Sequence, residues 1–71
     1  MKILILGSGQ VGSTIARNLA TLHNNDVTII DIDREALKSI GSKLDVQTVV
    51  GNGASPKVLE HAGAADADLL L

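Results

Sequence analysis

The sequence predicts an α/β fold, a parallel sheet with helices on both of its faces. Short apolar runs alternate with amphipathic stretches, which gives the element order βαβαβαβ. The first apolar run leads directly into a glycine-rich turn of the pattern G-x-G-x-x-G, from Gly7 to Gly12. The second apolar run ends on an acidic residue, Asp31, nineteen positions beyond Gly12. This combination is the fingerprint of a Rossmann-type dinucleotide-binding fold.

The first strand is expected over residues 3–6, and the helix that follows the glycine turn is expected to end at residues 23–25. The buried stripe of this helix is predicted from residues at helical spacing, which are Val11, Ile15, Leu19 and Leu22, widened by Ala16 and Ala20.

The second strand is expected over residues 27–31, and Asp33 is a suitable N-cap for the next helix. Gly41 weakens this helix somewhat, because glycine is a poor helix former. The residues that share its buried face are Leu37, Ile40 and Leu44.

The third strand is expected over residues 46–50, and the turn Gly51-Asn52-Gly53 closes it. Ser55 is expected to cap a short helix with Pro56 at its first position, and Gly63 to stop it. A final strand is expected to begin at about residue 67, and the given sequence is expected to end inside this strand. The apolar residues of the short helix are Val58, Leu59 and Ala62.

Right-handed crossovers place these strands in the order 3-2-1-4. The loop from Gly7 to Gly12, Asp31 and the loop at residues 51–54 then share the carboxyl edge of the sheet, where ligands bind in such folds. Residues 1–71 are therefore expected to form the N-terminal part of one dinucleotide-binding domain.

Composition excludes several classes of function. Apolar residues make up 45% of the chain, but there is no Phe, Tyr or Trp, so the core must be aliphatic. The absence of cysteine excludes a disulfide framework and a thiolate metal site. A net charge of −2 argues against a nucleic-acid surface. The chain shows neither a secretion signal nor an apolar run long enough to span a membrane.

Each glycine of the motif has its own predicted role. Gly7 makes the tight turn, Gly9 lets the backbone approach a pyrophosphate, and Gly12 allows close packing of helix on strand. Free N–H groups from Gln10 onward favour a diphosphate. Asp31 is predicted to accept hydrogen bonds from a ribose 2'-hydroxyl, which favours NAD over NADP because a carboxylate repels a 2'-phosphate.

Other polar residues are weaker candidates. Asp26 precedes its strand, and Asp33 is better explained as an N-cap, so position favours Asp31 as the ribose ligand. Arg34 is close to Asp31 in the sequence, which keeps NADP as an alternative cofactor. The other polar residues have simple structural interpretations. His23 and His61 are expected to be exposed side chains at helix ends, and Ser8, Ser13 and Thr14 to be hydroxyls near the loop. Asp66 and Asp68 are expected to be alternating positions at a strand entrance. No lysine follows the loop, which excludes phosphoryl transfer by a P-loop.

Particular segments of the chain also resemble a known family. They are Met1-Lys2-Ile3, Gly7-x-Gly9-Gln10-Val11-Gly12, Asn24-Asn25-Asp26-Val27, Ile30-Asp31, Gly51-Asn52-Gly53-Ala54-Ser55 and Ala64-x-Asp66-Ala67-Asp68. Together they resemble the RCK or KTN family, the N-terminal nucleotide-binding domains of the regulatory subunit of bacterial Trk potassium uptake. The resemblance covers essentially the whole chain.

This resemblance implies a regulatory domain and not an enzyme. Such a domain binds NAD(H), or ATP or ADP in related members, and passes the identity of the ligand to a membrane potassium-translocating subunit. It also implies a homo-oligomer that is cytoplasmic and peripheral to the inner face of the cell membrane, without contact to nucleic acid and without insertion into the membrane.

Carried over residue by residue, the resemblance implies a cofactor site. The diphosphate would lie on Gly7, Gly9, Gln10, Val11 and Gly12, with Ser8 among them, and the adenosine ribose on Asp31. Ile32, Asp33 and Arg34 would lie near the adenosine, and Asn52, Gly53, Ala54 and Ser55 on the adenine side.

Two other functions stay open. The chain could be the cofactor-binding half of an NAD-dependent dehydrogenase whose catalytic groups lie in a further domain. A methyltransferase is less favoured, because its loop usually needs glycine where Val11 stands.

Overall fold

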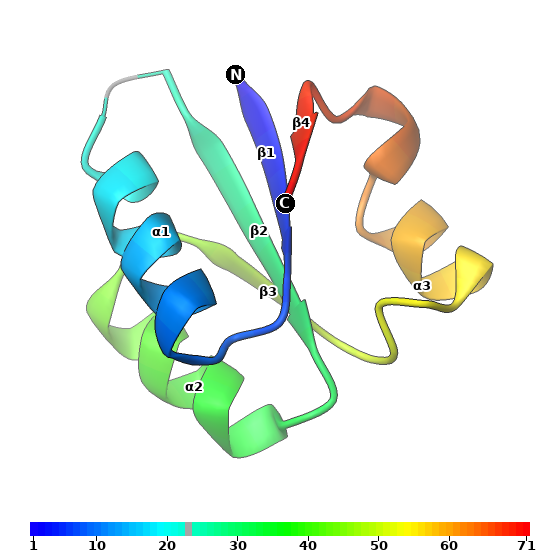
Figure 1. Ribbon diagram of the computed structural model, residues 1–71, viewed down its shortest axis with the longest axis horizontal. Coiled ribbons are helices and arrows are strands. Elements are labelled where there is room, and N and C mark those ends of the chain that lie inside the picture. The colour runs from blue at the N-terminus through cyan, green and yellow to red at the C-terminus, as the bar shows by residue number, and fades with distance from the viewer. Residues whose placement is uncertain (23) are drawn as a thin grey trace.

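The computed structural model describes residues 1–22 and 24–71 (Figure 1). Within them the strands form one parallel sheet in the order β3-β2-β1-β4, which confirms the predicted fold class and strand order. In chain order the elements are β1 (Lys2–Leu6), α1 (Gln10–Ala20), β2 (Asp26–Asp31), α2 (Arg34–Lys43), β3 (Gln47–Val50), α3 (Pro56–His61), the 3-10 turn η1 (Ala64–Asp66) and β4 (Leu69–Leu70).

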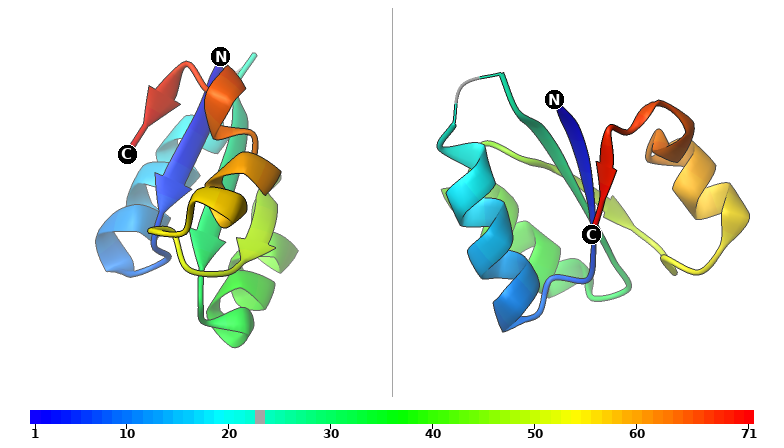
Figure 2. Two further views of the ribbon diagram at one scale, coloured as in Figure 1. Left: turned by 90° about the vertical axis from the view of Figure 1, so that its right-hand side faces the viewer. Right: turned by 45° about the horizontal axis from the view of Figure 1, so that its top comes forward.

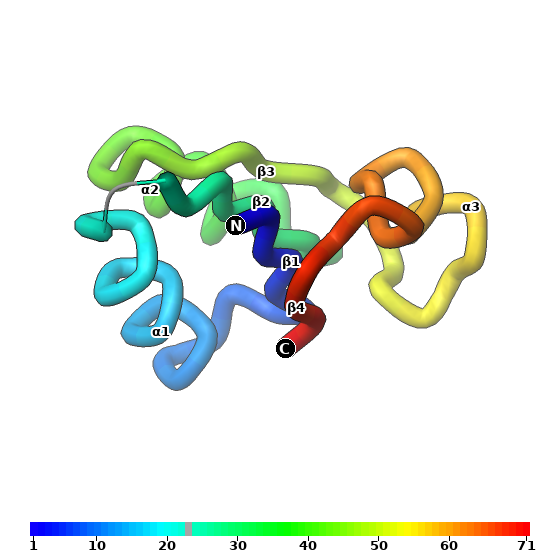
Figure 3. Tube along the Cα trace, turned by 90° about the horizontal axis from the view of Figure 1, so that it is seen from above, coloured from blue at the N-terminus to red at the C-terminus, as the bar shows by residue number. Residues whose placement is uncertain are grey.

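Helices cover both faces of the sheet, as predicted. Side chains alternate along a strand, so neighbouring residues of β1 face opposite sides. On one side Ile3 and Ile5 pack with Leu37 under α1 and α2. On the other side Leu4 packs with Ala62 under α3. Figure 2 and Figure 3 show this arrangement, with α1 and α2 together on one side of the strands and α3 on the other.

The register brings the ends of the central strands together. Leu6, at the end of β1, lies beside Ile30 of β2, and Asp31 lies beside Val50 of β3. The Gly7 N–H donates to the Ile30 carbonyl at 2.7 Å, and the Gly51 N–H donates to the Asp31 carbonyl at 2.9 Å. The loops that follow β1, β2 and β3 therefore leave the sheet at one edge.

The helices α2 and α3 begin in different ways. Asp33 caps α2 as predicted, because its Oδ1 accepts a hydrogen bond from the Ala36 N–H at 3.1 Å. The predicted side-chain cap of Ser55 is wrong: its hydroxyl makes no capping bond to α3. Pro56 at the start of α3 has no N–H to satisfy, which reduces the need for a cap. Gly63 follows the helix with φ +86°, so the predicted stop is confirmed.

Two residues predicted in the buried stripe of α1 lie in solvent. Val11 is 74% exposed and Leu22 is 58% exposed. Leu22 lies beyond the end of α1 at Ala20, where helical spacing no longer applies. Val11 lies in the first turn, at the edge of the sheet. The residues of α1 that pack on the core are Ile15, Ala16 and Leu19.

The last strand begins later than predicted. Residues 64–66 form η1, so β4 starts at Leu69 and not at about residue 67. Asp66 therefore lies in a 3-10 turn, and its interpretation as a strand-entrance residue is wrong. Asp68 does precede the strand, and its Oδ2 accepts from the Lys2 N–H at 2.7 Å. Pairing with β1 continues to Leu71, whose N–H donates to the Leu4 carbonyl at 2.9 Å.

The structure also bears on metal binding by the histidines and on whether a helix could cross a membrane. His23 lies outside the described residues, and His61 is the last residue of α3. In residues 1–22 and 24–71, no three His, Asp or Glu side chains are grouped closely enough to hold a metal ion. The helices in this part of the chain are too short and too polar to cross a bilayer; α1 has 11 residues.

Candidate functional site

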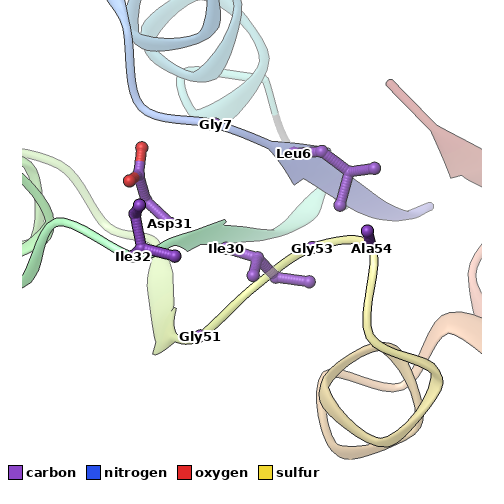
Figure 4. Close-up of a pocket in the computed structure, with 8 residues that line it drawn as sticks. All are labelled: Leu6, Gly7, Ile30, Asp31, Ile32, Gly51, Gly53 and Ala54. Carbon is purple, nitrogen blue, oxygen red and sulfur yellow. The ribbon is translucent and has the colours of Figure 1, made fainter.

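A pocket of about 360 Å³ lies where the loops after β1, β2 and β3 meet (Figure 4). We call it the first pocket. Its walls are mostly aliphatic, and Asp31 is its charged residue. Its lining residues are Leu6, Gly7, Ile30, Asp31, Ile32, Gly51, Gly53 and Ala54.

A second pocket of about 370 Å³ shares Leu6 and Gly7 with the first and extends along the start of α1. The two pockets meet at the end of β1, so together they form a depression suited to a ligand with two halves joined in the middle. The second pocket is lined by Ile5, Leu6, Gly7, Gly9, Gln10, Val11, Gly12, Ile15 and Leu71.

The three motif glycines differ in what the fold requires of them. Gly7 has φ +98°, a conformation that other residues rarely adopt. A Cβ at Gly12 would lie 2.3 Å from the carbonyl oxygen of Gly7, so any side chain there would force the loop to move. Gly9 has an ordinary φ of −61°, and a Cβ there would meet nothing within 4 Å. The fold explains Gly7 and Gly12, whereas the space beside Gly9 is open to a ligand.

The first turn of α1 leaves backbone donors free. Gly9 is the N-cap and has no side chain to cap the helix, and the first helical bond runs from the Ser13 N–H to the Gly9 carbonyl at 2.8 Å. The N–H groups of the preceding residues of the turn have no partner within the helix. The turn contains no acidic residue. These donors and the helix dipole make this point suitable for an anion.

Asp31, the last residue of β2, is held by the glycine loop. Its Oδ2 accepts from the Ser8 N–H and from the Ser8 hydroxyl, both at 2.6 Å, and its Oδ1 accepts from the Asp33 N–H at 2.8 Å. These bonds, the Ser8 hydroxyl first among them, lower the pKa of Asp31 to about 2. Figure 4 shows the carboxylate turned toward the loop near Gly7. Asp31 is therefore charged at neutral pH.

The two pockets bring together some of the predicted site residues and leave others outside. Asn52 holds its own loop, because its Oδ1 accepts from the Ala54 N–H at 2.9 Å. Arg34 is exposed at the start of α2. The predicted residues that line a pocket are Gly7, Gly9, Gln10, Val11, Gly12, Asp31, Ile32, Gly53 and Ala54. Those that line neither are Ser8, Asp33, Arg34, Asn52 and Ser55.

Sequence reasoning missed the apolar walls of the pockets. Leu6 and Ile30 are the last apolar residues of β1 and β2, and the apolar pattern predicts both as strand residues only. Gly51 belongs to the wall between them and α3, because a Cβ there would lie 2.8 Å from the Val58 side chain. The signal for these residues is their place at the carboxyl ends of strands, where a parallel sheet binds ligands.

The parallel sheet, the glycine turn and the acidic end of β2 define a Rossmann-like nucleotide-binding domain. The match to known sequences is more specific. The chain belongs to the TrkA-N domain family, whose model matches residues 3–71. This result confirms the resemblance found in the sequence.

Proteins of known name match over all 71 residues. The chain is 49% identical to the Trk system potassium uptake protein TrkA of Halomonas elongata and 51% identical to that of Haemophilus influenzae. It is 45% identical to the Trk system potassium uptake protein trkA homolog 1 of Methanosarcina mazei. The chain covers 15% of the first two proteins and 16% of the third. It therefore corresponds to a small part of these relatives.

Proposed function

We propose that this TrkA-N domain binds NAD(H) across the two pockets, and that the polypeptide carrying it uses nucleotide binding to regulate a potassium-translocating membrane subunit. The open space beside Gly9 is the single observation that carries the proposal. Gly7 and Gly12 are needed by the fold, but only a ligand that comes close to the backbone gives a reason for glycine at position 9.

The groups around the pockets suit the parts of NAD(H). The free N–H groups in the first turn of α1 offer donors to a diphosphate. Asp31 offers acceptors to the adenosine ribose, and its negative charge disfavours a 2'-phosphate. Ile32 and Ala54 offer aliphatic surface to the adenine ring in the first pocket. The second pocket has room for the other half of the dinucleotide. ATP and ADP share the adenosine and diphosphate groups and are the alternative ligands.

The lining of the second pocket supports a role in binding more than in hydride chemistry. None of its lining residues has a titratable side chain. These residues therefore supply no proton donor or acceptor beside the bound cofactor, which general acid–base catalysis would need. We propose that the domain senses the nucleotide and does not transform it.

The proposed partner follows from the relatives. Their names describe potassium uptake proteins of the Trk system. By this relationship we propose a homo-oligomer on the cytoplasmic side of the membrane, in contact with the Trk-type potassium-translocating subunit. We propose that the domain neither contacts nucleic acid nor inserts into the bilayer.

The test is calorimetric titration of the full polypeptide that carries these residues, with NADH, NAD, ATP, ADP and NADPH. Gly9→Val should reduce affinity for NADH by at least about 100-fold, because the side chain would occupy the space of the diphosphate and remove most of its binding. The backbone of Gly9 accepts a side chain, so circular dichroism should show a folded variant.

Gly41→Ala is the matched control. Gly41 lies in α2, where a Cβ would make an ordinary contact of 3.6 Å with Thr48. This variant should bind NADH as the wild type does. Wild-type affinity in folded Gly9→Val, or no binding of any of the five nucleotides by the folded wild type, would contradict the proposal. Turnover of common dehydrogenase substrates would favour the enzyme instead.

A further inference from the structure

The second residue of the glycine loop, Ser8, lies between two segments of the site. Its N–H and its hydroxyl both donate to Oδ2 of Asp31 at 2.6 Å, and its carbonyl accepts from the Ser13 hydroxyl at 2.8 Å. Ser8 is half-buried and lines neither pocket. A ligand in the first pocket would meet the Asp31 carboxylate and not the Ser8 hydroxyl.

The acceptor capacity of Asp31 is almost filled. An ionised carboxylate has about four acceptor positions, two on each oxygen. Ser8 fills both positions on Oδ2, and the Asp33 N–H fills one on Oδ1. The Ile32 N–H contributes more weakly to the same carboxylate. These three bonds therefore leave at most one position on Oδ1 open, whereas a ribose presents two neighbouring hydroxyl groups.

Only one of the three donors to Asp31 can leave without a change in the backbone. The Ser8 N–H is fixed by the loop, where the adjacent Gly7 N–H is bonded to Ile30. The Asp33 N–H is fixed because Asp33 caps α2. The Ser8 hydroxyl can move by rotation about a single side-chain bond.

We infer that the Ser8 hydroxyl competes with a ribose hydroxyl for Oδ2 of Asp31, and thereby limits how strongly the site selects ribose over 2'-deoxyribose. This inference rests on the proposed function, since it concerns the adenosine ribose of NAD. In the wild type one ribose hydroxyl takes the open position on Oδ1. A second can bond only by displacing the Ser8 hydroxyl, so one bond is lost for each one gained. Ser8 is thus a positioning residue that acts through Asp31.

The test compares the affinities of the full polypeptide for NAD and for the NAD analogue that lacks the 2'-hydroxyl of the adenosine ribose. In the wild type the ratio of the two dissociation constants should stay below about threefold, because the remaining hydroxyl still takes the open position. In Ser8→Ala the ratio should rise by roughly three- to tenfold, the effect of one net hydrogen bond, because both oxygens of Asp31 then have room. A purely structural role of Ser8 would weaken both ligands alike.

Ser13→Ala is the control, because the Ser13 hydroxyl bonds the same loop but not Asp31; its ratio should equal that of the wild type. Ser8→Thr keeps the hydroxyl and should also keep the wild-type ratio. If Ser8→Ala does not fold, Ser8→Cys replaces the hydroxyl with a weak donor and should raise the ratio in the same direction.

The outcomes separate this inference from the proposed function. A higher ratio in Ser8→Ala or Ser8→Cys supports competition. An unchanged or lower ratio, in a protein that binds NAD, overturns the inference and leaves the proposed function standing. Absence of NAD binding by the folded wild type overturns both, and it is visible before any variant is compared.

Discussion

Three hydrogen bonds converge on the carboxylate of Asp31 where β2 ends. Two come from Ser8 and one from Asp33, and all three favour the charged form. The same contacts join the glycine loop to the start of α2. The charge of Asp31 is therefore part of the folded structure as well as of the proposed site.

This arrangement predicts a loss of stability in acid. The Ser8 hydroxyl and the other donors lower the pKa of Asp31 from 3.8 to about 2 in the folded protein. Between these values the unfolded chain binds more protons, so the contribution is full above about pH 4 and is lost as pH falls through about 2. Because Asp31 is partly exposed, we expect roughly 1 kcal/mol of the free energy of unfolding to be lost in this range.

Urea unfolding of the wild type and of Asp31→Asn between pH 5 and pH 2, at about one-unit steps, measures this loss. The difference between the two proteins should shrink as pH falls. Asp45→Asn removes one carboxylate from an exposed position and is the control for the general effect of losing one negative charge. A difference between the wild type and Asp31→Asn that does not change with pH would mean that the bonds to Asp31 do not favour its charged form.

At the level of single residues, the glycine motif and Asp31 were predictable because each has a fixed position relative to an apolar run. The bond between Ser8 and Asp31 was not. It joins residues 23 positions apart and depends on the register of β1 with β2 and on a side-chain rotamer. The spacing of residues along the sequence predicts neither this register nor this rotamer.

The helices α2 and α3 show that a suitable N-cap residue is not always used as one. Asp33 bonds the Ala36 N–H, but Ser55 makes no side-chain bond to α3. Both residues have the type expected at an N-cap. The two helices also differ in their first residue, which is Arg34 in α2 and Pro56 in α3.

This contrast predicts unequal effects of two similar substitutions. Asp33→Ala should lower the free energy of unfolding by about 1 kcal/mol, because it removes the cap of α2. Ser55→Ala should change it by less than about 0.5 kcal/mol, since no capping bond is lost. Urea unfolding at neutral pH measures both. Equal losses would show that Ser55 caps α3 in solution.

At the level of elements, periodicity predicted the bounds of β1, β2 and β3 to within one residue. It did not predict where α1 ends, so Leu22 was placed on a buried face that the helix does not reach. It also missed η1, because a turn of three residues has no period to detect. Helix ends and short turns depend on local hydrogen bonds and not on the spacing of apolar residues.

The two faces of the whole molecule are unequal. Under α1 and α2 the core includes fully buried residues of both central strands and of both helices. Under α3 it is smaller, and α3 itself contributes no buried residue. The region from α3 to β4 should therefore be the first to open.

Hydrogen exchange of a polypeptide of these 71 residues tests this expectation. Amides in β1 and β2 should be the most protected. Those in α3 and β4 should exchange at least about tenfold faster, because fewer apolar contacts hold them. Similar protection across the whole sheet would show that both faces open as one unit.

At the scale of the fold, the order of elements and of strands was predictable because right-handed crossovers allow few alternatives. The position of the two pockets at one edge of the sheet could be predicted from the sequence, but their shape could not. Their walls depend on which apolar side chains stay uncovered where strands end, as Leu6 does at 41% exposure. That outcome depends on the packing of all three loops.

The three glycines of the loop also differ in what they reveal about related sequences. A relative that has lost nucleotide binding must still keep glycine at position 12, because the carbonyl of Gly7 leaves no room for a methyl group. Glycine at position 7 is similarly retained for its backbone angle. Position 9 is under no such constraint, so substitutions there should accumulate once a ligand no longer needs the space. Among sequences with this fold, residue 9 is therefore the diagnostic position that separates binding domains from domains that have kept only the shape.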